Sequence, residues 1–339
     1  MTGGSGEGGR ARPGGGQRLD EFQRIARYFA PLAAGWPGAL GLADDAALVE
    51  APPGQTLVVT ADALVASVHY RGDEPAELIA AKLLRVNLSD LAAMGAKPLA
   101  YLVVLALPAE IGDDWIEGFA GGLEREQAIF GLSLIGGDSV ATPGPACLSL
   151  TAFGAVPVGR ALRRDGARAG DTVFVSGTIG DAALGLIAVR DGLDPVGESD
   201  RAWLIDRYRV PRPRIELGQR LIGLAHAAQD VSDGLVADLG HICTTSGVGA
   251  VIEADKIPLS PAARAALPAA GQGPILGGGD DYELLFTTAA ADRGRVADLA
   301  RGLDLALTEI GRIRSGRGVR VVDRDGREVS LPVPGYRHG

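Results

Sequence analysis

Nine aspartates stand beside glycine, serine or alanine in six short runs, and carboxylates in this pattern could bind divalent cations. The runs are Ala43-Asp44-Asp45-Ala46, Thr60-Ala61-Asp62, Ser89-Asp90, Gly136-Gly137-Asp138, Asp230-Val231-Ser232-Asp233 and Gly277-Gly278-Gly279-Asp280-Asp281. Carboxylates without neighbouring lysine, cysteine or histidine are ligands for hard cations, and small flanking residues let the backbone approach a phosphate. So many carboxylates at one site would repel one another unless several divalent ions bound there, which indicates Mg²⁺–nucleotide chemistry. Any single run is more simply a turn, but turn formation does not explain the whole set.

The chain lacks the motifs through which common kinases hold ATP. It has no GxxxxGK[ST] loop and only three lysines, and the HRD and DFG motifs of protein kinases are absent. Clustered aspartates with Mg²⁺ can still support phosphoryl transfer, because the metal ions bridge and neutralise phosphate oxygens. If the attacking group is itself an anionic phosphate, no general base is required. The turn at residues 177–180 could hold phosphate on backbone N–H groups, and a plain strand-to-helix turn explains it equally well.

The elements that must position these residues are predicted from hydrophobic periodicity. In the first half we expect a helix from residue 19, strands over 46–49, 56–60, 99–107 and 148–156, and helices from Pro75 to Gly95 and over 113–130. Asn87 and Asp90 would share one helix face. In the second half we expect strands over 171–176, 249–253, 282–287, 307–313 and 319–322, and helices from Asp181 and over 201–208, 213–228, 235–244 and 289–302.

Length and pattern together predict two α+β domains. A chain of 339 residues suits about two domains, and strands and helices do not alternate strictly enough for a doubly wound sheet. Residues 1–18 form a glycine-rich tail that we expect to be disordered. The proline-, glycine- and arginine-rich segment 155–171 is the expected boundary, which gives domains over 19–157 and 158–339. The basic stretch at 207–214 is interpreted as a surface or interdomain segment.

Composition excludes several classes of protein. The net charge of −9 argues against nonspecific binding to nucleic acid or to an anionic membrane. The longest apolar run, at 99–108, is about ten residues, against roughly 20 for a membrane span. Two cysteines without a CxxC spacing indicate neither a zinc site nor a disulfide framework, so we expect a cytoplasmic protein.

Several motifs, in chain order, resemble the thiamine-monophosphate kinase family of the aminoimidazole-ribotide-synthetase-like superfamily. They are Gly41-Leu42-Ala43-Asp44-Asp45-Ala46-Ala47, Thr60-Ala61-Asp62-Ala63-Leu64-Val65, Val86-Asn87-Leu88-Ser89-Asp90-Leu91-Ala92-Ala93-Met94-Gly95-Ala96, Leu134-Ile135-Gly136-Gly137-Asp138, Val175-Ser176-Gly177-Thr178-Ile179-Gly180-Asp181, Asp230-Val231-Ser232-Asp233-Gly234-Leu235 and Gly279-Asp280-Asp281-Tyr282-Glu283-Leu284. The resemblance runs from about residue 21 to residue 336, nearly the whole chain. The combination is specific, whereas a single GGD or SDG would mean little.

This resemblance implies a fold and a reaction. The N-terminal domain would bind metal and ATP and pair with a second subunit in a homodimer, and the C-terminal domain would complete the ATP and substrate site. The reaction would be the ATP- and Mg²⁺-dependent phosphorylation of thiamine monophosphate to thiamine diphosphate by direct in-line transfer. ATP and thiamine monophosphate would be the partners, without nucleic acid or membrane.

The resemblance also implies roles for individual residues. Several Mg²⁺ ions would be held by Asp45, Thr60, Ala61, Asp62, Asp90, Asp138, Asp230 and Asp233. Among these, Asp62, Asp138 and Asp233 would be catalytic. ATP would contact Gly137, Asp138, Arg164 and Ser232, and the thiamine phosphate would contact His69, Asp280 and Tyr336.

Two departures from the family pattern keep other functions open. The family usually has Ser-Thr-Asp where this chain has Thr60-Ala61-Asp62, and usually has Glu at the position of Asp280. A sibling enzyme of the superfamily is one alternative, although no cysteine precedes residue 147 and none stands at the C-terminus, as two of the siblings require. A metal–nucleotide-binding protein without turnover is the other, and substrate-dependent ADP release would distinguish it.

Overall fold

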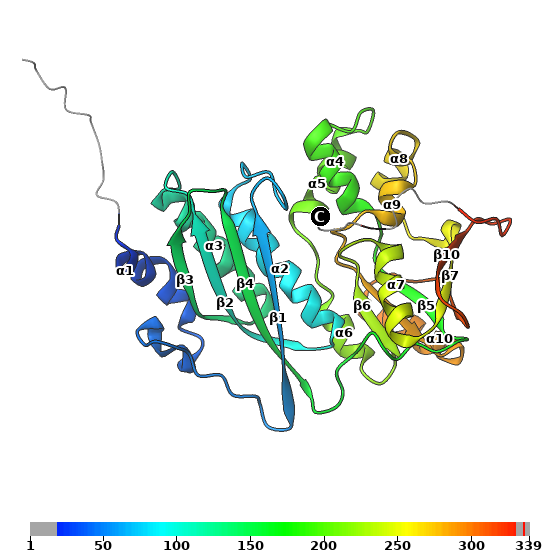
Figure 1. Ribbon diagram of the computed structural model, residues 1–339, viewed down its shortest axis with the longest axis horizontal. Coiled ribbons are helices and arrows are strands. Elements are labelled where there is room, and N and C mark those ends of the chain that lie inside the picture. The colour runs from blue at the N-terminus through cyan, green and yellow to red at the C-terminus, as the bar shows by residue number, and fades with distance from the viewer. Residues whose placement is uncertain (1–18, 330–334, 336–339) are drawn as a thin grey trace, which may run out of the picture.

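The structure is a computed structural model that describes residues 19–329 and 335. It consists of two domains lying side by side, each built on one β-sheet (Figure 1). The predicted α+β class with two domains is therefore confirmed. The tail at 1–18 and Tyr336 lie outside the described residues. Within the described part of the chain, no helix is long and apolar enough to cross a membrane.

The N-terminal sheet has four strands in the order β1-β4-β2-β3. Their bounds are β1 (Gln55–Val65), β2 (Lys97–Leu107), β3 (Ser133–Ala141) and β4 (Cys147–Pro157). β4 pairs antiparallel with β1 and β2, whereas β2 and β3 are parallel. β1 and β3 are consequently the edge strands, and both carry residues of the predicted site.

Two long helices cover one face of this sheet (Figure 1), namely α2 (Ala76–Ala93) and α3 (Asp113–Phe130). α2 follows Pro75 and ends before Gly95, whose φ of +72° is the left-handed conformation expected at a helix end. α2 is buried on nearly every side, because the sheet, α3 and the C-terminal domain each cover part of it.

The segment before β1 is irregular; it qualifies one prediction and corrects another. It contains α1 (Glu21–Arg24), η1 (Ile25–Phe29), η2 (Ala30–Ala33) and η3 (Pro37–Leu42). The helix predicted from residue 19 begins at Glu21, but it is α-helical only to Arg24 and continues as a π-helical turn and then 3₁₀ turns, and Phe22 in its first turn is 81% exposed. The predicted strand at 46–49 is wrong. Its Leu48 N donates to the Gly38 carbonyl at 2.8 Å, and not to a neighbouring strand.

The C-terminal sheet has six strands in the order β10-β7-β9-β5-β8-β6. They are β5 (Thr172–Ser176), β6 (Ala227–Asp230), β7 (Gly249–Glu253), β8 (Leu284–Thr288), β9 (Leu307–Arg314) and β10 (Gly318–Val322). The pairs are antiparallel except for β10 with β7. The sequence predicted five of these strands and missed β6.

Helices pack around this second sheet. They are α4 (Asp181–Asp191), α5 (Glu198–Arg209), α6 (Ile215–Leu221), α7 (Leu235–Ser246), α8 (Pro261–Ala270), α9 (Gly273–Gly277) and α10 (Arg293–Leu303), with short turns η4 (Ala254–Lys256) and η5 (Ala290–Asp292). The predicted helix over 213–228 is wrong beyond Leu221, because the chain turns at Gly223 (φ +79°) and then forms β6 beside β8. α8 and α9 were not predicted.

The two domains share an apolar interface at the C-terminal end of α2. Ala92 and Ala93 are buried in one cluster with Leu217 and Leu221 of α6 and with Phe286 of β8. At Gly218, an added Cβ would lie 2.0 Å from the carbonyl oxygen of Ala92, so only glycine allows α6 to approach α2 this closely. The interface places the last turn of α2, with Asp90, against the second domain.

Candidate active site

Two carboxylates of the N-terminal domain lie on the side of the sheet that faces α2. Asp62 is in β1, and Asp90 is in the last turn of α2. Thr60 Oγ1 donates to Asp90 Oδ2 at 2.5 Å, and the backbone N of Asp62 donates to Asn87 Oδ1 at 3.0 Å. Asn87 and Asp90 therefore share a helix face, as predicted, and that face is turned toward β1.

The C-terminal domain supplies the other carboxylates of this acidic cluster, which we define as Asp62, Asp90, Asp230 and Asp233. Asp230 ends β6, and Ser89 Oγ donates to its Oδ2 at 2.7 Å, a hydrogen bond that joins the two domains. Asp62 lies in a strand, Asp90 in a helix, as expected, and Asp230 at a strand end, so these aspartates are not simply turn residues.

The acidic cluster carries more negative charge than its surroundings neutralise. Burial, then the Asp90 and Asp233 carboxylates, raise the pKa of Asp62 to about 6. Burial and Asp90 raise the pKa of Asp230 to about 8. Burial also raises the pKa of Asp90, although the hydrogen bond from Thr60 and the charge of Arg164 oppose the increase. A set of oxygen ligands that is short of positive charge fits hard divalent cations.

Gly137 and Asp138 lie in β3, at the opposite edge of the N-terminal sheet, and the side chain of Asp138 is on its other face. The register places Asp62, Leu150, Val103 and Gly137 in one row across the four strands. Asp62 thus shares the helix-covered face with buried Val103, whereas Asp138 is one residue further along and shares the open face with Val104. Three strand spacings amount to ~14 Å. One chain therefore does not bring Asp138 to the acidic cluster.

Asp45 accompanies Asp138 at this edge. Both residues and Gly137 line a cavity of about 820 Å³ between β3 and the segment before β1. Gly137 has no room for a side chain, because an added Cβ would lie 1.9 Å from the carbonyl oxygen of Val103. The predicted metal ligands thus fall into two groups, the acidic cluster and the Asp45–Asp138 pair.

Arg164 and Ser232, the predicted ATP contacts of the C-terminal domain, both lie near the acidic cluster. The positive charge of Arg164 opposes the rise that burial causes in the pKa of Asp90, and the Arg164 carbonyl accepts a hydrogen bond from Ser246 Oγ at 2.8 Å. Ser232 N donates to Asp238 Oδ2 at 3.1 Å. Ser232 O in turn accepts from Asp280 N at 2.9 Å, which connects the nucleotide segment to the predicted substrate segment.

Two of the three predicted substrate residues, His69 and Asp280, are joined by a lysine that the sequence did not single out. Lys82 Nζ lies 3.1 Å from Asp280 Oδ2 and 3.4 Å from the His69 carbonyl oxygen. Tyr336 is outside the described residues, but Gly335 packs against Ala237 and the Asp233 backbone.

The glycine turn at 177–180 has its donors occupied from inside the protein. Gly180 N donates to Asp281 Oδ2 at 2.6 Å, and Ala182 N donates to Asp281 Oδ1 at 3.1 Å. Burial raises the pKa of Asp281 to about 8. Of the two explanations for this turn, the plain strand-to-helix turn agrees with these contacts.

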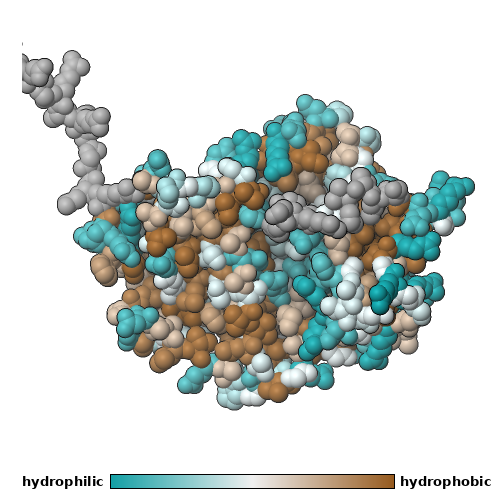
Figure 2. Space-filling model, in the orientation of Figure 1, coloured by the Kyte–Doolittle hydropathy of each residue, from teal (hydrophilic) through white to brown (hydrophobic). Residues whose placement is uncertain are grey.

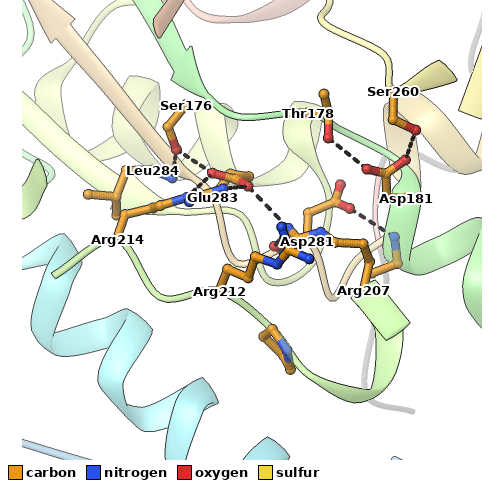
Figure 3. A network of polar contacts seen from close by, with 12 residues as sticks. Ser176, Thr178, Asp181, Arg207, Arg212, Arg214, Ser260, Asp281, Glu283 and Leu284 are labelled. Atoms are coloured by element: carbon orange, nitrogen blue, oxygen red, sulfur yellow. Dashed lines mark hydrogen bonds and ion pairs between the residues drawn. The ribbon is translucent and has the colours of Figure 1, made fainter. Parts of the chain in front are cut away.

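Glu283 is a further buried acidic residue that the sequence did not single out. Figure 3 shows its carboxylate between Ser176 and Arg214, with Arg207 on the far side. Ser176 Oγ donates at 2.6 Å, Arg214 Nε at 2.6 Å and Arg207 Nη2 at 3.1 Å. The surface interpretation of residues 207–214 is wrong for Arg207, which is 2% exposed. The sequence offers one signal for this ion pair. The basic stretch at 207–214 needs acidic partners, and Glu283 has no basic residue close to it in the chain.

The basic segment also contacts the other domain. Arg85 of α2 donates to the Pro211 carbonyl oxygen at 2.9 Å and to both carboxylate oxygens of Glu126. The interdomain interpretation of the segment is therefore confirmed. The segment holds α5 and α6 against α2, beside the elements that carry the acidic cluster.

Comparisons with known proteins agree with this arrangement. Residues 43–156 match the family described as "AIR synthase related protein, N-terminal domain", and residues 168–324 match the corresponding C-terminal domain family. The thiamine-monophosphate kinase of Salmonella typhimurium is 43% identical over 94% of this chain and 98% of its own length.

Solved structures of similar proteins have the same fold. The thiamine-monophosphate kinase of Stenotrophomonas maltophilia is 47% identical, with a TM-score of 0.77 over 85% of this chain and 91% of that one. The structure of AaThiL in complex with AMPPCP and TMP is 34% identical, with a TM-score of 0.74 over 87% of this chain and 91% of that one. With both domains matched and relatives above 40% identity over nearly the full length, this chain belongs to the thiamine-monophosphate kinase family of AIR synthase related proteins.

Proposed function

We propose that this protein transfers the γ-phosphoryl group of ATP directly to thiamine monophosphate, giving thiamine diphosphate and ADP in an Mg²⁺-dependent reaction. The acidic cluster carries the proposal, because both domains contribute to it and the positive charge of Arg164 offsets its negative charge only in part. The relatives named thiamine-monophosphate kinase and the neighbour in complex with AMPPCP and TMP support the same substrates.

The acidic cluster suits Mg²⁺ by its ligand chemistry. Its ligands are carboxylate oxygens, which hard cations prefer, and their raised pKa values show that the group as a whole favours added positive charge. We assign metal binding to Asp62, Asp90, Asp230 and Asp233, with Thr60 orienting Asp90 and Ala61 able to contribute only backbone atoms. Bound Mg²⁺ would supply charge neutralisation of the triphosphate oxygens.

The chain's own contribution is to orient the two substrates. We assign the acceptor to the His69 and Asp280 segments, which Lys82 joins. Asp280 is close to the acidic cluster: burial raises the pKa of the intervening Tyr282 well above its usual range, and the charges of Asp280, Asp62, Asp230 and Asp90 add to the increase. The acceptor phosphate is already anionic, so no residue is needed to remove a proton from it, and alignment with ATP would carry the catalysis.

We further propose a homodimer formed by the N-terminal sheets. The open sheet face exposes Val59 (56%), Val104 (40%) and Val140 (46%), and Figure 2 shows apolar surface gathered there. β1 and β3 are free edges in the described chain, so a second copy can pair its β3 with β1 and its β1 with β3. That pairing would place the partner's β3, with the partner's Asp138 and the partner's Gly137, directly beside β1, the strand that carries Asp62, and would bring the partner's Asp45 to the same edge.

The remaining assignments follow from this arrangement. We propose residues 19–157 as the metal- and ATP-binding, dimerising domain and 158–339 as the domain that completes the site. The compartment we propose is the cytoplasm, since Cys147 and Cys243 are both unpaired.

The test is a direct assay. Purified protein is incubated with ATP, Mg²⁺ and thiamine monophosphate, and the thiamine esters are separated by chromatography while ADP is measured. We expect equal amounts of thiamine diphosphate and ADP, and neither product when EDTA replaces Mg²⁺. ATP binding without formation of thiamine diphosphate would contradict the proposal.

A further inference from the structure

Lys82 is a buried cation at the junction of the two domains. It lies in the middle of α2 and is 4% exposed, whereas the other lysines, Lys97 and Lys256, lie on the surface. Lysine is seldom buried unless its charge is paired, because desolvating an ammonium group is unfavourable. The groups that contact the Lys82 ammonium should therefore explain why a positive charge is buried at this junction.

The partners of Lys82 come from three other segments. Its Nζ lies 3.1 Å from Asp280 Oδ2, 3.4 Å from the His69 carbonyl oxygen and 3.7 Å from the centre of the Tyr208 ring. Tyr208 Oη donates to the same His69 carbonyl at 3.0 Å. One ammonium group thus fixes the segment after β1, the end of α5 and the segment before β8 relative to one another.

Asp280 combines a left-handed backbone conformation with two partners for its carboxylate. Its φ is +70°, in the left-handed region that disfavours residues other than glycine. Its two carboxylate oxygens have separate partners, Lys82 on Oδ2 and the Tyr282 hydroxyl at 3.4 Å on Oδ1. The side chain is still 32% exposed. The carboxylate is held from behind and keeps an accessible edge.

We propose that Lys82 is a positioning residue for the acceptor substrate, which sets the place of the Asp280 carboxylate and of the His69 segment. The inference rests on the proposed function, which assigns the acceptor to the His69 and Asp280 segments, and thiamine monophosphate carries a cationic thiazolium ring that a carboxylate can recognise. A carboxylate that is pinned in one geometry recognises a cation without first losing side-chain entropy.

The experiment compares Lys82→Met with Lys97→Met, a matched change at an exposed lysine. Lys82→Met removes the charge while keeping a similar apolar stem. We expect the KM for thiamine monophosphate to rise about tenfold, as for the loss of one charged hydrogen bond. The KM for ATP and kcat should stay within about twofold of the wild type, and Lys97→Met should change none of these constants.

A double variant tests the route through Asp280. In an Asp280→Asn background, Lys82→Met should add less than a further twofold to the KM for thiamine monophosphate, because the carboxylate it positions is gone. Full additivity, or an equal loss in kcat and in both KM values, would overturn the inference.

Two controls separate this inference from folding and from the proposed function. If Lys82→Met fails to fold by circular dichroism, Tyr208→Phe removes only the hydroxyl bond to His69 and should raise the same KM by about threefold; an unchanged KM would overturn the inference. Wild-type protein that forms no thiamine diphosphate would contradict the proposed function, whereas an active wild type with an unaffected Lys82→Met variant would contradict this inference alone.

Discussion

At the residue scale, the main feature is a pair of carboxylates whose ionisation opposes folding. The pKa of Asp62 is raised to about 6 and that of Asp230 to about 8, against about 3.9 in an unfolded chain. The folded protein therefore binds these protons more tightly than the unfolded chain does. Their contribution to stability is complete below pH ~4 and is lost as the pH rises toward ~8. A bound cation would reverse that loss.

The loss of folding stability with rising pH gives a testable prediction for protein treated with EDTA. We expect the melting temperature to fall between pH ~5 and ~8, and Mg²⁺ to restore it in proportion to the logarithm of its concentration. Differential scanning calorimetry at several pH values measures both effects. Asp230→Asn, which removes the ionisable group without changing its shape, should flatten the pH dependence and weaken the Mg²⁺ effect. A variant that keeps the full pH dependence would contradict the role given to Asp230.

At the element scale, the connection between β6 and α7 is shaped by one side chain, Asp238. Its Oδ2 accepts from the backbone N of Ser232 at 3.1 Å, Asp233 at 3.0 Å and Gly234 at 3.0 Å. Its Oδ1 accepts from Gln229 Nε2 at 2.7 Å. Asp238 thus turns a flexible Asp-Val-Ser-Asp-Gly segment into a fixed arrangement of predicted metal and ATP contacts.

The prediction is that Asp238→Ala weakens nucleotide binding more than acceptor binding. Three backbone N–H groups would lose their acceptor, which costs about 3 kcal/mol of the free energy of unfolding and frees the segment. The KM for ATP and the Mg²⁺ requirement should rise, whereas the KM for thiamine monophosphate changes little.

Asp238→Asn is the matched control for this prediction. Its remaining oxygen can still accept the three N–H groups. The new amide can donate to Gln229 Oε1, which has no partner among the described residues. We expect this variant to be close to wild type in both KM values, and an equally damaged Asp238→Asn would show that the charge matters rather than the hydrogen bonds.

At the scale of the whole molecule, the predicted catalytic residues Asp62 and Asp138 lie on opposite faces of one sheet. If the site is completed by a second copy, each active site takes its acidic cluster from one chain and Asp138 from the other. Two inactive variants would then complement each other. Half of the dimers in an equal mixture are mixed, and each mixed dimer has one intact site.

We therefore predict that Asp62→Asn and Asp138→Asn each reduce turnover by orders of magnitude, and that mixing them after subunit exchange recovers about a quarter of wild-type activity. Both single variants should remain folded. Asp138 lies on an edge strand, and its Oδ1 accepts from Ser139 N at 2.8 Å, a bond that asparagine can keep. An absence of recovery in a mixture shown to exchange subunits would mean that the site does not use both chains in this way.

The sequence by itself determined most of the elements and the identity of the chemistry. Helix 113–130 begins and ends where predicted, and β2, β4 and most strands of the second domain follow their apolar runs, because local periodicity reflects burial on one side. The aspartate motifs predicted cation and nucleotide chemistry because carboxylates flanked by small residues have few other uses in such number. The irregular start at residues 19–42 and strand β6 were missed, since backbone turns and tertiary pairing override local pattern there.

Only the tertiary structure decided how the motifs combine. It placed Asp90 beside Thr60 and joined Ser89 to Asp230 across the domains. It also separated Asp138 from Asp90 and Asp230, because sheet register and strand face depend on partners distant in the sequence. It also revealed Lys82 and Glu283, whose importance lies in desolvated charge pairs, and burial of a single charged residue leaves no periodic signal in the chain. Spacing along the sequence specifies which groups can do the chemistry, whereas packing between the domains specifies which of them meet.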